Sequence, residues 1–263
     1  AAHDFQLQGG SFLRALGGDG SVAQPWQIAD VYGLQGIGSS GMLNQAYALA
    51  NDIDASGTTA WNAGAGFLPI GNNTTKFTGT FFGSGHTISG LTINRPGNDF
   101  VGLFGYTADA TIGDLTLTAA QINGANEVGA LAGESNSSYI HDVTVDGSIT
   151  GQNRNVGGLA GVAVNSSLSV VRSGGHVSGG GDFTGGLVGI NTGTIGSAYT
   201  TSTVIGSICG KDGRRGSGAA DTTSEPAVCS DTCEASSFCR RNRVTSMSRP
   251  ASTSRCSDKR PTL

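Results

Sequence analysis

The chain has 263 residues, of which 44 are glycine and only 13% are charged. Residues 1–208 contain 5 Lys/Arg and 13 Asp/Glu, a net charge of −8, whereas residues 209–263 contain 10 and 6, a net charge of +4. All five cysteines lie in the second stretch, which excludes a disulfide framework from the first 208 residues. No apolar run approaches the roughly 18 residues needed to cross a bilayer, so we expect no membrane insertion.

In chain order, residues 1–24 are expected to be an N-terminal lead-in. They lack a charged leader followed by an apolar segment, so we expect that any signal peptide has been removed. Residues 25–100 predict irregular β-helix coils, with a turn of helix at 41–45 and a protruding loop at 56–66 around Trp61. The expected strands in this part are residues 47–50, 67–70, 77–81 and 87–93.

Residues 101–208 contain an internal repeat with a period of about 28 residues. The segment Gly102-Leu103-Phe104-Gly105 is followed at this spacing by residues 130–133, 158–161 and 186–189. A second apolar anchor recurs at Ile112, Ile140, Leu168 and Ile195, the last one residue early, and a third at Ile122, Ile149, Val177 and Val204. Each unit therefore predicts three short strands separated by Gly, Asn and Ser turns.

A fixed register of this kind predicts a parallel β-helix, or β-solenoid. A single repeat unit cannot bury its apolar face alone, whereas stacked units bury it continuously. The stacked leucines would be Leu103, Leu131, Leu159 and Leu187. We expect three parallel sheets around a narrow apolar interior, with right-handed crossovers. A globular β-sandwich has strands at similar spacing but has no reason to keep a constant register.

Residues 209–263 depart from this pattern. The register stops, and Cys, Arg and Ser replace the large apolar residues that a folded core needs. We expect a tail of low order. Because nothing in it resembles a solenoid cap, we also expect a truncated repeat array followed by a segment that is not native to the repeat protein.

The glycine-leucine anchors resemble the GLUG motif repeats of bacterial surface proteins. Residues 49–71 and 77–93 are similar to the segment that precedes those repeats in filamentous-haemagglutinin-like adhesins, and the resemblance covers roughly residues 25–206. It implies an extracellular or cell-surface adhesin that is part of a longer protein. The implied partner is a host or matrix glycan, a protein or a neighbouring cell. Such repeats also occur as accessory regions of surface peptidases, and the repeat itself defines no catalytic residue, metal or cofactor.

Two pairs of carboxylates are candidates for a chemical site. Asp52 and Asp54 would share one face of a strand, and with His86 they suggest an alternative function as a β-helix polysaccharide lyase or hydrolase. Asp114 and Asp142 are one repeat period apart and should stack on adjacent coils, but Val170 takes the next equivalent position. In both pairs we favour turn-forming residues over a cation or catalytic site.

The other candidate sites are weaker still. His86, His141 and His176 do not share the repeat spacing, and Cys229, Cys233 and Cys239 lack the second ligand pair of a zinc knuckle. Gly174–Gly175 and Gly179–Gly181 lack the residues of a phosphate loop, and the arginines of the tail lack the aromatics and scaffold expected of nucleic-acid binding. A row of Thr116 and Thr144 suggests ice binding as a further alternative, but it continues as Arg172 and Tyr199. The sequence therefore predicts a structural or binding protein without catalytic, metal or cofactor residues.

Overall fold

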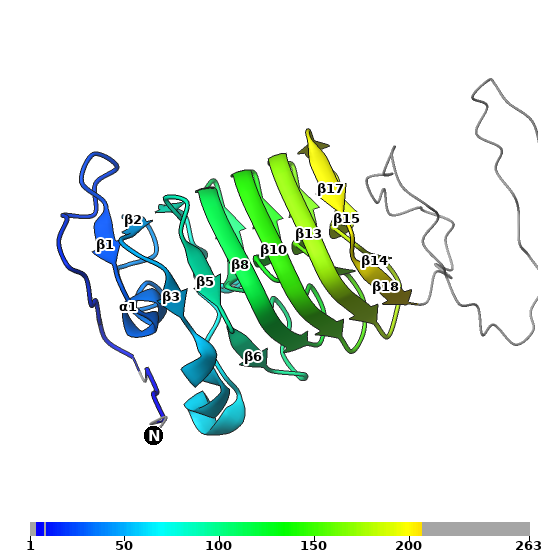
Figure 1. The fold of residues 1–263 in the computed structure, drawn as a ribbon, viewed down its shortest axis with the longest axis horizontal. Coiled ribbons are helices and arrows are strands. Elements are labelled where there is room, and N and C mark those ends of the chain that lie inside the picture. Colours follow the sequence, from blue (N-terminus) through cyan, green and yellow to red (C-terminus); the bar gives the residue numbers. More distant parts are fainter. Residues whose placement is uncertain (1–3, 8, 207–263) are drawn as a thin grey trace, which may run out of the picture. The chain divides into compact units, whose positions relative to one another are not determined.

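The computed structural model describes residues 4–7 and 9–206, which form a parallel β-solenoid (Figure 1). The predicted fold class is confirmed. The expectations for residues 209–263 lie outside the described residues. Within the described part, neither helical segment is long and apolar enough to cross a membrane.

Strands account for nearly all of the regular structure. The N-terminal elements are β1 (Trp26–Ile28), α1 (Val31–Gly36), β2 (Ala46–Leu49), β3 (Ile53–Asp54), the 3-10 segment η1 (Ser56–Gly64), β4 (Thr80–Phe82), β5 (Thr87–Ser89) and β6 (Thr92–Asn94). The repeat units contribute β7 (Phe104–Ala108), β8 (Thr111–Gly124), β9 (Ala132–Asn136), β10 (Tyr139–Gly151), β11 (Val156–Gly157), β12 (Ala160–Val164), β13 (Ser167–Gly179), β14 (Thr184–Gly185), β15 (Val188–Asn191), β16 (Thr194–Ile195), β17 (Ala198–Thr200) and β18 (Thr203–Gly206).

The strands form three sheets whose ladders are parallel. The largest has 12 strands, with the main order β1-β2-β4-β8-β10-β13-β16, and the second has the order β15-β12-β9-β7. The third is the short pair β11-β14. In Figure 1, β8, β10 and β13 lie side by side as successive rungs of the largest sheet.

Strand pairing confirms the repeat register. Phe104 pairs with Ala132, Ala132 with Ala160, and Ala160 with Val188, each one repeat period further along the chain. At the second anchor, Leu168 pairs with Ile195, so the last unit is one residue shorter, as its sequence indicates. The predicted third anchor is also aligned, from Ile122 to Val204.

The number of strands per coil differs from the expectation of three. β8, β10 and β13 each run without interruption through both the second and third anchors. Within these strands Asp114, Asp142 and Val170 adopt left-handed backbone conformations, with φ of 55°, 51° and 53°, and the pairing continues on both sides of each. An extra residue near Ala119 in β8 adds a bulge, since Val145 pairs with Leu117 but Gly147 pairs with Ala120.

Hydroxyl groups satisfy the backbone at one buried corner of the coils. Ser138 Oγ accepts a hydrogen bond of 3.2 Å from Ala110 N, and Ser166 Oγ accepts one of 3.1 Å from Ser138 N. The residue before each of these serines has a left-handed backbone conformation, with φ of 48° for Ser137 and 49° for Asn165. Because serine and asparagine tolerate these conformations and bonds, the turn can recur on each coil without glycine.

The core is one continuous stack of apolar side chains. Leu103, Leu131 and Leu159 are fully buried, and Leu187 is 2% exposed. Towards the N-terminus the stack becomes aromatic, with the Phe77 and Phe104 rings 4.8 Å apart between centroids. The interior at that end of the solenoid therefore takes larger side chains.

The N-terminal coils contain several departures from the expected elements. Residues 67–70 are not a strand, and residues 41–45 form a turn that is not helical. The helix lies instead at α1, where Asp30 Oδ1 accepts a hydrogen bond of 2.8 Å from Gly33 N as an N-cap. Leu34 in α1 is fully buried, so this helix covers core residues of the first coil.

Residues 56–66 do not form the irregular loop that the sequence predicts. Most of the segment is η1, and the Trp61 side chain is only 2% exposed. Its ring contacts those of Phe5, Tyr32 and Phe67, with centroid distances of 5.0, 5.2 and 6.4 Å. The segment thus joins the lead-in, α1 and the second coil through one aromatic cluster.

Candidate functional site

A groove of about 380 Å³ lies between η1 and the outer face of the largest sheet. Its lining residues are Thr59 and Gly64 of η1; Thr92, Ile93 and Asn94 of β6; Gln121, Ile122 and Asn123 of β8; and Ser148 and Thr150 of β10. Ile93 and Ile122 are buried in the core, so the exposed lining is formed by amide and hydroxyl side chains. None of the lining residues is charged.

The strand register orders these polar groups in rows across the coils. Thr92, Gln121 and Ser148 occupy one row, which continues with His176 and Thr203. In the neighbouring row, Asn123 Nδ2 donates to Asn94 Oδ1 at 2.9 Å, and beside it Gln152 Nε2 donates to Asn123 Oδ1 at 3.0 Å. These bonds hold the amides of successive coils in fixed orientations.

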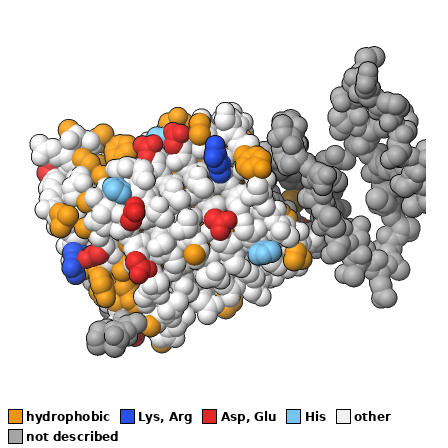
Figure 2. All heavy atoms as spheres, viewed as in Figure 1, with side chains coloured by type: hydrophobic (Ala, Val, Ile, Leu, Met, Phe, Trp, Pro, Cys, Tyr) orange, Lys and Arg blue, Asp and Glu red, His pale blue; other side chains and the backbone are white. Residues whose placement is uncertain are grey.

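The wider face around the groove is also poor in charge. Figure 2 shows that the surface of β8, β10 and β13 is mainly uncharged polar side chains and backbone, with scattered acidic, basic and histidine residues. Amides and hydroxyls both donate and accept hydrogen bonds, so such a surface suits a neutral ligand with many hydroxyl groups.

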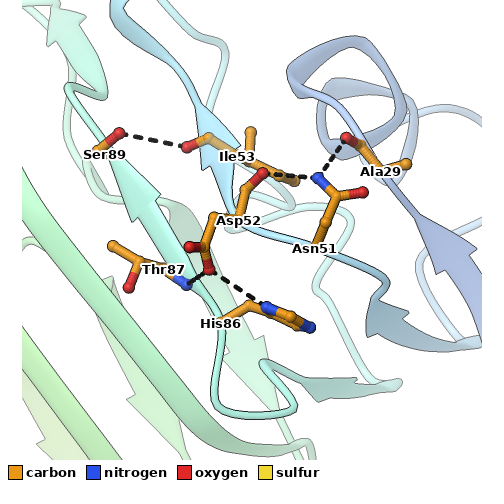
Figure 3. A network of polar contacts seen from close by, with 7 residues as sticks. All are labelled: Ala29, Asn51, Asp52, Ile53, His86, Thr87 and Ser89. Carbon is orange, nitrogen blue, oxygen red and sulfur yellow. Dashed lines mark hydrogen bonds and ion pairs between the residues drawn. The ribbon is translucent and has the colours of Figure 1, made fainter.

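Asp52 forms a polar contact between two coils (Figure 3). Its Oδ1 accepts a hydrogen bond of 2.9 Å from Thr87 N and lies 3.2 Å from His86 Nδ1. The bond from Thr87 N, followed by the one from His86, holds the pKa of the Asp52 carboxyl below its ordinary value. The sequence groups His86 with Asp52 only in the polysaccharide-degrading alternative, and the structure places these two side chains in contact.

Asp54 lies in a different arrangement. Its Oδ1 accepts a hydrogen bond of 2.9 Å from Ser56 N at the start of η1, which is the turn-forming role expected from the sequence. Hydrogen bonds from Ser56 lower the pKa of the Asp54 carboxyl too. A general acid of a glycoside hydrolase needs a raised carboxyl pKa, so the environment of Asp52 and Asp54 does not supply the acid of the polysaccharide-degrading alternative.

We expect Asp52→Ala to destabilise the protein at pH 7 and to destabilise it less at about pH 2. The folded pKa of Asp52 lies below the ordinary value of 3.8, so the stabilisation is present above pH 3.8 and disappears as the pH falls through the folded pKa. Urea unfolding of wild type and variant at both pH values measures this. The exposed Asp146 offers a matched control, and a difference between wild type and Asp52→Ala that is as large at acid pH as at pH 7 would contradict the assignment.

Asp114 and Asp142 occupy equivalent positions on adjacent coils, as the sequence indicates, and the structure adds His141 to them. His141 Nδ1 lies 3.0 Å from Asp142 Oδ2, and one ligand atom from each of the three side chains lies within 4.8 Å of the others. The sequence does not predict this group, because His141 is compared there only with the other histidines and not with Asp114 and Asp142. The signal was present, since the repeat step places His141 opposite Gly113, next to Asp114.

The threonine row and the glycine-rich stretch can be located in the described residues. Thr116, Thr144, Arg172 and Tyr199 lie in register, so the threonine row ends after the second repeat coil. In the glycine-rich stretch of β13 the backbone of Gly175 lies close to that of Gly147 on the preceding coil. A side chain would not fit there, since a Cβ on Gly175 would lie 2.1 Å from Gly147 O. The cysteine and arginine candidates of residues 209–263 lie outside the described residues.

Glu127 is a carboxylate that was not among the candidates from the sequence. Burial raises the pKa of its carboxyl, which accepts a hydrogen bond of 2.9 Å from Asn155 Nδ2 on the next coil. Glu127 and Asn155 both have positive φ, so they belong to another repeated corner of the coils. We assign Glu127 a structural role at this corner.

The sequence matches no family model. Halomucin of Haloquadratum walsbyi is 43% identical over 144 residues, which is 52% of this chain and 2% of halomucin. A candidate Gly-rich membrane protein of Evansella cellulosilytica is 34% identical over 125 residues, 45% of this chain and 14% of that protein. The chain therefore spans a small part of the length of either relative.

A solved structure shares the architecture. The crystal structure of a candidate immunoglobulin A1 protease from Bacteroides ovatus superposes with a TM-score of 0.53, covering 73% of this chain and 70% of that one. The two sequences are 16% identical, so the likeness shows the fold alone.

Proposed function

We propose that the chain is part of a longer extracellular or cell-surface protein, in which the solenoid acts as an adhesive rod that binds neutral glycans in the groove between η1 and the largest sheet. The observation that carries the proposal is the uncharged lining of that groove, with amides held in place from coil to coil. The names of the two relatives, a halomucin and a Gly-rich membrane protein, support a location at the cell surface. The GLUG-type anchors support an adhesin.

The groove suits a glycan for two physical reasons. Hydroxyl groups of a sugar can exchange donor and acceptor roles with Gln121, Asn123 and Thr150, which present both. The rows also repeat at the spacing of successive strands, about 4.8 Å, so an extended chain lying along the solenoid can make similar contacts on each coil. A charged ligand would find no opposite charge among the lining residues.

The double variant Gln121→Ala/Thr150→Ala should reduce glycan affinity by about thirtyfold, because it removes two hydrogen-bonding groups worth roughly 1 kcal/mol each. The fluorescently labelled full chain is first screened on a panel of neutral and acidic polysaccharides, and the affinity for the neutral glycan that binds best is then compared in the variant. Thr144→Ala, which lies on β10 outside the groove, is the matched control and should bind as wild type does.

Two results would overturn the proposal. One is the absence of binding to every neutral glycan of the panel. The other is a glycan affinity that stays the same in the double variant, which would place the binding surface away from the groove.

A further inference from the structure

We propose that Asp114, His141 and Asp142 form a binding site for a divalent transition-metal ion of the zinc class. The site lies on β8 and β10, apart from the groove residues, and does not depend on the proposed glycan binding. It offers one imidazole nitrogen and two carboxylate oxygens from adjacent coils. This mixed set matches the ligands of zinc and related ions, whereas magnesium and calcium prefer oxygen alone.

The donor atoms are close enough to share one ion. All three lie within 4.8 Å of one another. Ligands bonded to zinc at about 2.1 Å in a tetrahedral arrangement are about 3.4 Å apart, so modest rotations of the side chains complete the geometry. The side chains of Asp114 and Asp142 are exposed and can make these rotations. The fourth coordination position of the ion stays open to water or an external ligand.

The imidazole is the fixed part of the site. The His141 side chain is 19% exposed, and its ring stacks on that of Tyr139 with centroids 4.8 Å apart. The ring also lies close to Gly113 of the preceding coil, where a Cβ would come within 2.2 Å of His141 Cε1. Glycine at position 113 therefore leaves the space that the imidazole occupies beside Asp114.

Electrostatics favour a cation at this place. Two carboxylates at equivalent positions on adjacent strands repel each other, and a divalent ion between them removes that repulsion. The arrangement does not extend along the solenoid, because Ser169 and Val170 replace His141 and Asp142 on the next coil. We therefore expect one ion per chain from this site.

Zinc titration of the full chain tests the site. The five cysteines outside the described residues could bind zinc themselves, so the titrations use a background in which Cys209, Cys229, Cys233, Cys239 and Cys256 are replaced by serine. After treatment with a chelator, calorimetric titration with zinc sulfate should show one saturable site. Magnesium chloride, titrated in the same way, should bind much more weakly.

His141→Ala and Asp142→Asn should each weaken zinc binding by about tenfold or more, since loss of even an outer partner of a metal ligand has effects of that size. His176→Ala, a histidine of the same sheet far along the strand from the site, is the matched control and should leave the affinity unchanged. Asp114→Asn provides a second, nearly isosteric variant if circular dichroism shows that His141→Ala is misfolded.

Gly113→Ala tests the positioning of the imidazole without removing a ligand. The added methyl group should displace the His141 ring, so the zinc affinity should fall although all three donors remain. The proposal is overturned if zinc shows no saturable binding, if it binds equally to the His141, Asp142 and His176 variants, or if magnesium binds as tightly as zinc.

Discussion

Leu159→Ala is expected to lower the free energy of unfolding by about 3 kcal/mol or more, because it leaves a cavity in the apolar core. Leu159 is fully buried in the middle of the leucine stack. Its backbone is fixed on both sides, because Leu131 N donates to Leu159 O at 2.9 Å and Leu159 N donates to Leu187 O at 2.8 Å. The neighbouring coils are thus held at the spacing of the sheet and cannot close over the cavity.

Urea unfolding followed by circular dichroism measures this loss. Leu16→Ala is the matched control, since that leucine is 75% exposed and its replacement should change stability by less than about 0.5 kcal/mol. Each coil contacts only its neighbours, so hydrogen exchange should quicken most in β9, β12 and β15. If Leu159→Ala lowered the free energy of unfolding by as little as the control does, a continuous apolar core at this coil would be contradicted.

Trp61→Ala should destabilise the N-terminal end of the solenoid by about 3–5 kcal/mol. The ring is the common contact of Phe5, Tyr32 and Phe67, so its removal leaves the lead-in, α1 and the second coil without the aromatic cluster that joins them. Because the interactions of a solenoid are local, the repeat coils from β8 to β13 should keep their protection.

Hydrogen exchange resolved by segment distinguishes this outcome from global unfolding. Faster exchange confined to residues 9–36 and 56–67 is the expected result. Tyr199→Ala is the matched control, because that aromatic residue lies 43% exposed on the last coil. Unchanged exchange around α1 in Trp61→Ala would show that the cluster does not hold the N-terminal coils together.

The repeat part of the fold was predictable because its signal is a constant period. The three anchors determine which residues pair, and even the short step from Leu168 to Ile195 is visible in the sequence. The N-terminal coils instead pair at unequal steps, from Trp26 to Tyr47, then to Phe81 and then to Ile112. Periodicity cannot find elements such as α1 and η1, which fill the insertions that make these steps unequal.

The candidate sites were less predictable, since they depend on side chains rather than on register alone. The contact of His86 with Asp52 joins coils at a spacing that differs from the repeat period. The groove depends on η1, because Thr59 and Gly64 of that segment line it together with residues of the sheet, whereas the sequence predicts only a protruding loop there. The position of His141 next to Asp114 could have been predicted from the sequence, because the repeat step places His141 opposite Gly113.

The constant step between β7, β9, β12 and β15 makes the middle coils interchangeable modules. Phe104 meets Ala132 in the same register in which Ala132 meets Ala160. Excision of residues 132–159 would therefore bring Phe104 opposite Ala160 with the hydrogen-bonding ladder preserved. Duplication of the same stretch would lengthen the rod by one strand spacing, about 4.8 Å. The architecture allows the length of such a solenoid to change by whole coils while the pairing between neighbouring coils stays the same.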